Sequence, residues 1–144
     1  MGSEILEVKN GLKLYRYKAE NKKNDCTVVF IHHMWGSYKT TWRHVQLLNS
    51  LGYDCVTFDL LLGSNLKKLK WNPLLRYTHL GVFYIWTRQI RLILNGIEGD
   101  KIMYGFSGPS LSCFWAADKR NDIRKIICDG GPFHEIYKNT KKYQ

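Results

Sequence analysis

The pattern of apolar and polar positions changes along the chain from alternation to continuous apolar runs. Residues 4–20, EILEVKNGLKLYRYKAE, alternate on both sides of Asn10-Gly11. This dipeptide between two alternating runs predicts a β-hairpin. The next run, CTVVFIH at residues 26–32, is apolar and β-branched throughout, as in a strand that is covered on both faces.

Helical periodicity follows in residues 40–52. Thr40 or Thr41 is the expected cap, Gly52 the expected end, and the apolar face consists of Trp42, Val45, Leu48 and Leu51. Residues 53–60, YDCVTFDL, then predict a second buried strand.

A less regular segment, residues 61–76, precedes a long helical pattern at residues 78–99. Gly99 is expected to end this helix, whose buried face is Phe83, Trp86, Ile90, Ile93 and Ile97. Further expected elements are a strand at 101–106, a helix at 108–120 and a strand at 123–130.

Alternation of buried strands with amphipathic helices predicts an α/β fold, a three-layer sandwich with a mostly parallel sheet and helices on both faces. The opening hairpin would add an antiparallel edge. At 144 residues the chain is expected to form one domain, residues 1–144.

One turn in this pattern contains a candidate nucleophile. The sequence Gly105-Phe106-Ser107-Gly108-Pro109 lies between the expected strand and the expected helix. A serine at such a turn projects its hydroxyl above the sheet edge, and the crowded backbone needs small residues two positions before and after it. The other interpretation is a Gly/Pro-rich turn that merely contains serine.

Four stretches resemble the α/β-hydrolase family in its usual order. VVFIHHMWGSYKTTW resembles the strand and oxyanion loop, and LGYDCVTFDL the next helix-to-strand passage. YGFSGPS resembles the nucleophile elbow, and IRKIICDGGPF the strand after the elbow helix. The resemblance covers about residues 11–133 and implies an α/β-hydrolase-like fold, truncated after the strand that follows the nucleophile helix.

The resemblance implies a role for three residues. Ser107 would be the nucleophile, and the amides of Met34 and Gly108 would form the oxyanion hole. Two positions depart from the family pattern: His33 replaces a glycine of the oxyanion motif, and Pro109 replaces the second elbow glycine. Proline is tolerated in the first turn of a helix, whereas histidine would adopt a glycine-type turn only with strain.

The acid and the base of a triad are not identifiable. In this family they follow the nucleophile, and the only later histidine is His134, which is expected in a surface tail. Asp129 ends a strand and is either an acid in a variant arrangement or a turn residue. His44 and His79 precede the elbow on helical patterns and are interpreted as ordinary packed side chains.

Charge and composition indicate which classes of partner and cofactor are expected. The net charge is +10, but the lysines are scattered and no nucleic-acid-binding motif accompanies them, so nucleic acid is not the expected main partner. No apolar run is long enough for a transmembrane segment, the amino-terminal residues are polar, and a cytoplasmic location is the default. No cofactor or metal site is predicted, and the four cysteines are expected to be reduced.

Two hypotheses follow. The first is a serine hydrolase of esterase or lipase type that acts on a small-molecule ester or acyl substrate through Ser107. The second is a catalytically incomplete hydrolase-fold fragment or pseudoenzyme that acts as a binding or interaction protein. Under either hypothesis the apolar last strand leaves a sheet edge, so self-association or a missing C-terminal segment covering that edge is expected.

Overall fold

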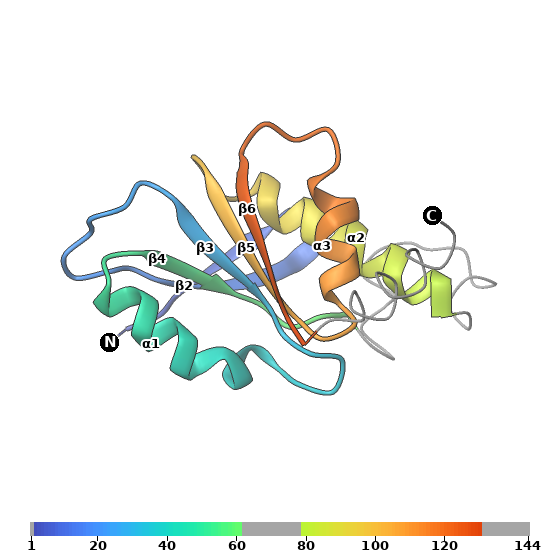
Figure 1. The fold of residues 1–144 in the computed structure, drawn as a ribbon, viewed down its shortest axis with the longest axis horizontal. Coiled ribbons are helices and arrows are strands. Elements are labelled where there is room, and N and C mark those ends of the chain that lie inside the picture. The colour runs from blue at the N-terminus through green and yellow to red at the C-terminus, as the bar shows by residue number, and fades with distance from the viewer. Residues whose placement is uncertain (1, 62–78, 131–144) are drawn as a thin grey trace, which may run out of the picture.

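The structure is a computed structural model, and it describes residues 2–61 and 79–130. Six strands form one sheet in the order β1-β2-β4-β3-β5-β6. Strands β4, β3, β5 and β6 run parallel, and β1 and β2 add an antiparallel edge (Figure 1). The strands are β1 (Glu4–Val8), β2 (Leu12–Tyr17), β3 (Thr27–Ile31), β4 (Asp54–Thr57), β5 (Lys101–Phe106) and β6 (Ile123–Asp129). The predicted mostly parallel α/β sheet is confirmed.

Helices cover both faces of this sheet (Figure 1). Helix α1 (Trp42–Ser50), preceded by the 3-10 turn η2 (Tyr38–Thr41), lies on one face. Helices α2 (His79–Asn95) and α3 (Ser110–Ala117) lie together on the other. The expected irregular segment at 61–76 falls almost entirely outside the described residues.

The side chains of β3 show why its sequence is apolar throughout. Val29 and Ile31 belong to the core beneath α2 and α3, whereas Val28 and Phe30 belong to the core beneath α1. Successive side chains of a strand point to opposite faces, so a strand between two helical layers must be apolar at every position.

The predicted hairpin is also present. β1 and β2 pair with Val8 opposite Leu12, and the turn between them contains a 3-10 turn, η1 (Lys9–Gly11). Asn10 and Gly11 both have φ of +67°, in the left-handed region that asparagine and glycine tolerate best.

Three details of the helices differ from the local expectations. Thr41 occupies the N-cap position as predicted, but its hydroxyl caps no amide of α1, because it donates to the carbonyl of Tyr38 three residues earlier. On the expected face of α1, Trp42 and Leu51 are exposed. Helix α2 ends at Asn95 and not at Gly99.

The chain passes close to β1 directly after the end of α2. A Cβ at Gly96 would lie 2.3 Å from Cγ1 of Val8, so only glycine lets the chain pass β1 this closely. The last turn then tightens, because the amide of Gly96 donates to the carbonyl of Ile93 at 3.0 Å.

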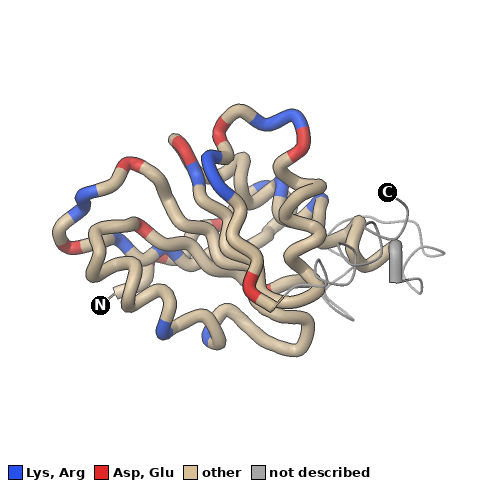
Figure 2. The backbone as a smooth tube through the Cα atoms, in the orientation of Figure 1, with Lys and Arg blue, Asp and Glu red and all other residues tan. Residues whose placement is uncertain are grey.

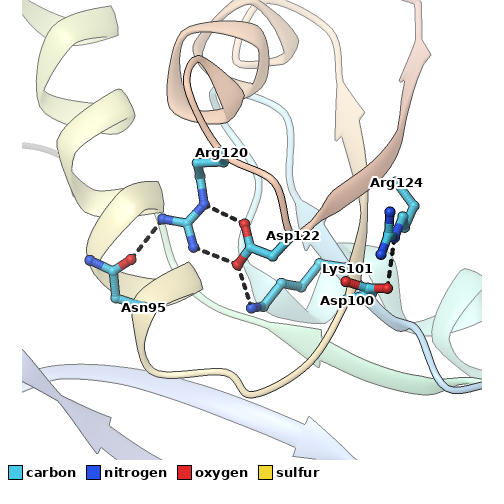
Figure 3. A network of polar contacts seen from close by, with 6 residues as sticks. All are labelled: Asn95, Asp100, Lys101, Arg120, Asp122 and Arg124. Atoms are coloured by element: carbon cyan, nitrogen blue, oxygen red, sulfur yellow. Dashed lines mark hydrogen bonds and ion pairs between the residues drawn. The ribbon is translucent and has the colours of Figure 1, made fainter.

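A polar network holds the amino end of β5 to the strand after it (Figure 3). The buried ammonium of Lys101 lies 2.7 Å from Oδ2 of Asp122, and Arg120 donates two hydrogen bonds to the same carboxylate. The hydrogen bonds from Arg120 are the largest influence lowering the pKa of Asp122 below its usual range. A second pair, Arg124 with Asp100, is more exposed.

Candidate active site

Ser107 lies between β5 and α3 in a backbone conformation that is rare for serine. Its φ is +56°, within the left-handed region that glycine favours. Neighbouring groups fix this conformation: the Ser107 amide donates to the carbonyl of Asp129 at 2.8 Å, and the Ser107 carbonyl accepts from the amide and the hydroxyl of Ser110. A residue held in this region costs about 1–3 kcal/mol and persists only where its surroundings enforce it. The turn predicted at this position is therefore sharp and tightly restrained.

The residues on either side of Ser107 explain how the chain makes this turn. A Cβ at Gly105 would lie 2.9 Å from Sγ of Cys113 and 3.0 Å from Cα of Ser110, so α3 packs directly on the strand. Pro109, which stands where the family has its second glycine, has φ of −57° and immediately precedes α3. Its fixed φ is already helical, so this departure leaves the turn intact.

The loop after β3 lies at the same edge of the sheet. In the parallel register Ile31 pairs with Gly105, and Phe106 pairs with Asp129, so β3, β5 and β6 end side by side (Figure 1). Met34 follows Ile31 by three residues and Ser107 follows Gly105 by two. The topology therefore brings the Met34 loop and the Ser107 turn to neighbouring positions.

The Met34 loop makes its turn without a left-handed conformation at His33. The amide of Gly36 donates to the carbonyl of His33 at 2.9 Å and closes the turn, and His33 has no positive φ. The loop therefore forms without the glycine-type conformation that histidine would adopt only with strain. Within the described residues, the amides of Met34 and Gly108 have no hydrogen-bond acceptor.

His32 has a structural role. Its Nε2 accepts from the amide of Leu60 at 2.9 Å, and its Nδ1 lies 2.6 Å from the carbonyl of His33, to which it donates in this tautomer. The residue is 2% exposed, and burial lowers the pKa of His32 below its usual value. A neutral His32 therefore ties the loop after β4 to the loop after β3.

The other histidines make no hydrogen bond to Ser107 in the described part of the chain. The ring of His44 packs among Phe30, Tyr104 and Phe106 beneath α1. His134 lies outside the described residues, as does the side chain of His79. No described histidine is therefore hydrogen-bonded to Ser107, as the catalytic base of a serine hydrolase would be.

Asp129 holds the elbow through its backbone. Its carbonyl accepts from the amide of Ser107, and its exposed carboxylate accepts a 3.3 Å hydrogen bond from the hydroxyl of Tyr104. Burial, together with the charge of Asp129, raises the pKa of Tyr104. These contacts give Asp129 a position at the same sheet edge as Ser107.

Comparison with solved structures finds proteins that have a similar architecture. A promiscuous phosphotriesterase resembling dienelactone hydrolases, P91 from metagenomic libraries, has a TM-score of 0.67 at 15% identity over 90% of this chain and 59% of its own. The esterase EaEST from Exiguobacterium antarcticum gives 0.63 at 16% identity over 91% and 46%, respectively. The epoxide hydrolase VrEH1 from Vigna radiata gives 0.61 at 18% identity over 88% and 37%.

The chain has the α/β-hydrolase fold. It spans between 37% and 59% of the length of these three solved structures. No family model and no curated protein matches the sequence. At identities below 20% the likeness extends to the fold, and the chemistry has to be argued from the residues.

Figure 2 shows basic and acidic residues interspersed along the described loops and strands. Among the described residues, no group of three histidine, cysteine or carboxylate side chains is arranged to hold a metal ion. No helix in the described part is both long and apolar enough to cross a membrane.

Proposed function

We propose that this chain is the nucleophile-bearing portion of an α/β-hydrolase-like serine hydrolase that acts on a small-molecule ester or related acyl bond. Ser107 Oγ attacks the carbonyl carbon, and the amides of Met34 and Gly108 stabilise the oxyanion that forms. Each such donor contributes about 3 kcal/mol to the stability of a tetrahedral intermediate. The observation that carries the proposal is the left-handed conformation of Ser107 on a turn pinned to Asp129 and Ser110.

The reaction requires a group that takes the proton from Ser107. As Oγ bonds to the carbonyl carbon, its proton passes to a base, which returns it to the leaving alcohol when the acyl-serine forms; water then releases the acid by the same route. Among the described residues, no histidine is hydrogen-bonded to Ser107. We therefore assign the base to a residue outside the described part, in the same chain or in a partner. A cytoplasmic location goes with this proposal, and cell fractionation would test it.

Labelling with a fluorophosphonate probe tests the nucleophile. Wild-type protein is expected to be labelled at Ser107, as located by peptide mass spectrometry. Ser107→Ala should abolish labelling, and Ser50→Ala, which removes an exposed hydroxyl from α1, should leave it unchanged. If labelling survives Ser107→Ala, Ser107 is not the nucleophile. If a folded wild-type sample is not labelled, the catalytically incomplete alternative is favoured.

A second candidate is a catalytically incomplete hydrolase-fold protein that binds a partner. One observation favours it: β6 pairs with β5 alone among the described strands. The apolar side chain of Ile127 on β6 is 36% exposed. An open strand of this kind pairs readily with another chain. Sedimentation velocity should then show association that increases with concentration and weakens in Ile127→Lys, whereas a monomer at all concentrations would count against self-association.

A further inference from the structure

The ring of Phe83 lies beside the turn that carries the proposed nucleophile. A Cβ built on Gly108 would meet Cζ of Phe83 at 3.8 Å and Cε1 at 3.9 Å, which is ordinary van der Waals contact. Gly108 follows Ser107 and carries one of the two proposed oxyanion donors. The aromatic ring is therefore the nearest described side chain on the side to which Gly108 would project.

Several contacts hold this ring in place. It makes edge-to-face contacts with Trp86, with ring centroids 5.4 Å apart, and with Trp115 at 6.5 Å. The backbone carbonyl of Phe83 accepts from the hydroxyls of Thr87, one turn later in α2, and Ser112 in α3. Phe83 is thus fixed relative to the helix that begins at the elbow, although its ring is only half-buried.

The second proposed oxyanion donor has an apolar neighbour as well. The side chain of Met34 is half-buried and packs against the same core as Phe83. Each of the two amides is therefore accompanied by a partly accessible apolar side chain, one from the β3 loop and one from α2.

We propose that Phe83 determines substrate specificity by contacting an uncharged, apolar acyl group of the ester. This inference rests on the proposed function, because it assumes that the carbonyl oxygen sits at the Gly108 amide. Because the Phe83 ring lies at van der Waals distance from a Cβ built on Gly108, an acyl group that lies beside Gly108 would contact this ring. In an apolar pocket, each methylene of a substrate changes reactivity by about 10- to 200-fold.

The test compares two fluorophosphonates that differ only in the alkyl group on phosphorus, methyl or hexyl. The measured quantity is the ratio of their labelling rates at Ser107. Phe83→Ala should lower the hexyl-to-methyl ratio by about tenfold or more. Tyr84→Ala, which truncates the more exposed neighbouring aromatic residue of α2, should leave the ratio unchanged.

Phe83→Leu is a second variant for the case that Phe83→Ala does not fold, because leucine keeps an apolar side chain at this position. It should lower the ratio less than alanine does. A ratio that is unaffected by both Phe83 variants, or equally affected by Tyr84→Ala, would overturn the specificity proposal even though Ser107 is labelled.

A non-covalent measurement separates this proposal from the nucleophile itself. Ser107→Ala protein with ¹³C-labelled methionine methyl groups is titrated with phenyl butyrate, and the Met34 resonance is assigned with Met34→Leu. The resonance should shift, and adding Phe83→Ala should reduce the shift. A shift without Ser107 labelling would retain the apolar subsite and reject the nucleophile. Absence of both would reject the subsite too.

Discussion

Gly105→Ala tests the packing on which the elbow depends. The added methyl group would lie 2.9 Å from Sγ of Cys113, 3.0 Å from Cα of Ser110 and 3.3 Å from Cβ of Ser110. Because Ser110 begins α3, relief of this contact has to move a helix and not merely rotate a side chain. Gly105 has no positive φ, so the expected effect is steric and not conformational.

The magnitude follows from two opposing effects. Overpacking of a well-packed interior costs about 1–3 kcal/mol. Replacement of glycine by alanine recovers about 0.4–1 kcal/mol, since it restricts the unfolded chain. The net loss of unfolding free energy should be about 1–2 kcal/mol, which for a chain of this size lowers Tm by about 2–8 °C.

The matched control lies three residues away in the same turn. A methyl group on Gly108 would find its nearest neighbour, the Phe83 ring, at 3.8 Å, and Gly108 also has no positive φ. Gly108→Ala should therefore be neutral or slightly stabilising in urea denaturation and calorimetry. Combining Gly105→Ala with Cys113→Ala should recover part of the loss, because Sγ is removed. Equal Tm values for the two single alanine variants would refute the steric explanation.

Two further predictions concern charge. The pKa of His32 is lowered in the folded chain, so the unfolded state binds the proton first as the pH falls. The free energy of unfolding should therefore be at its full value above pH about 6.5 and should decrease below it. In urea denaturation between pH 5 and 7, His32→Asn should flatten this dependence. Asp122→Asn leaves Lys101 buried without its ion-pair partner and should lower the unfolding free energy by about 3–5 kcal/mol, compared with under about 1 kcal/mol for Asp100→Asn at the exposed pair; equal losses would contradict this account.

The order of elements could be read from local patterns. β3 is apolar at every position because both of its faces are buried, and the Asn10-Gly11 turn has the backbone conformation that its residues favour. The helix ends were predicted less well. Gly99 has the positive φ of a helix-ending glycine, but α2 stops earlier, where Gly96 packs against Val8 from the far end of the chain.

Part of the candidate site could likewise be predicted from the sequence, and part could not. Ser107, Gly108 and the Met34 loop were found from the sequence, since glycine and proline around a serine mark a sharp strand-to-helix turn. Phe83 was recognised only as part of a helix face, and its position beside Gly108 was missed. No local signal could have identified it, because the two residues belong to different elements 25 positions apart.

The amino-acid sequence alone determined the alternation of strands and helices, the hairpin and the turn at Ser107, because each depends on residues within one turn or one strand. Tertiary structure decided which groups surround that turn: the Asp129 carbonyl on the Ser107 amide, Phe83 beside Gly108, and His32 between two loops. These contacts join residues 22 to 28 positions apart and arise only when parallel strands bring their carboxyl ends to one edge. Long-range packing, and not local preference, therefore determines the surroundings of the nucleophile.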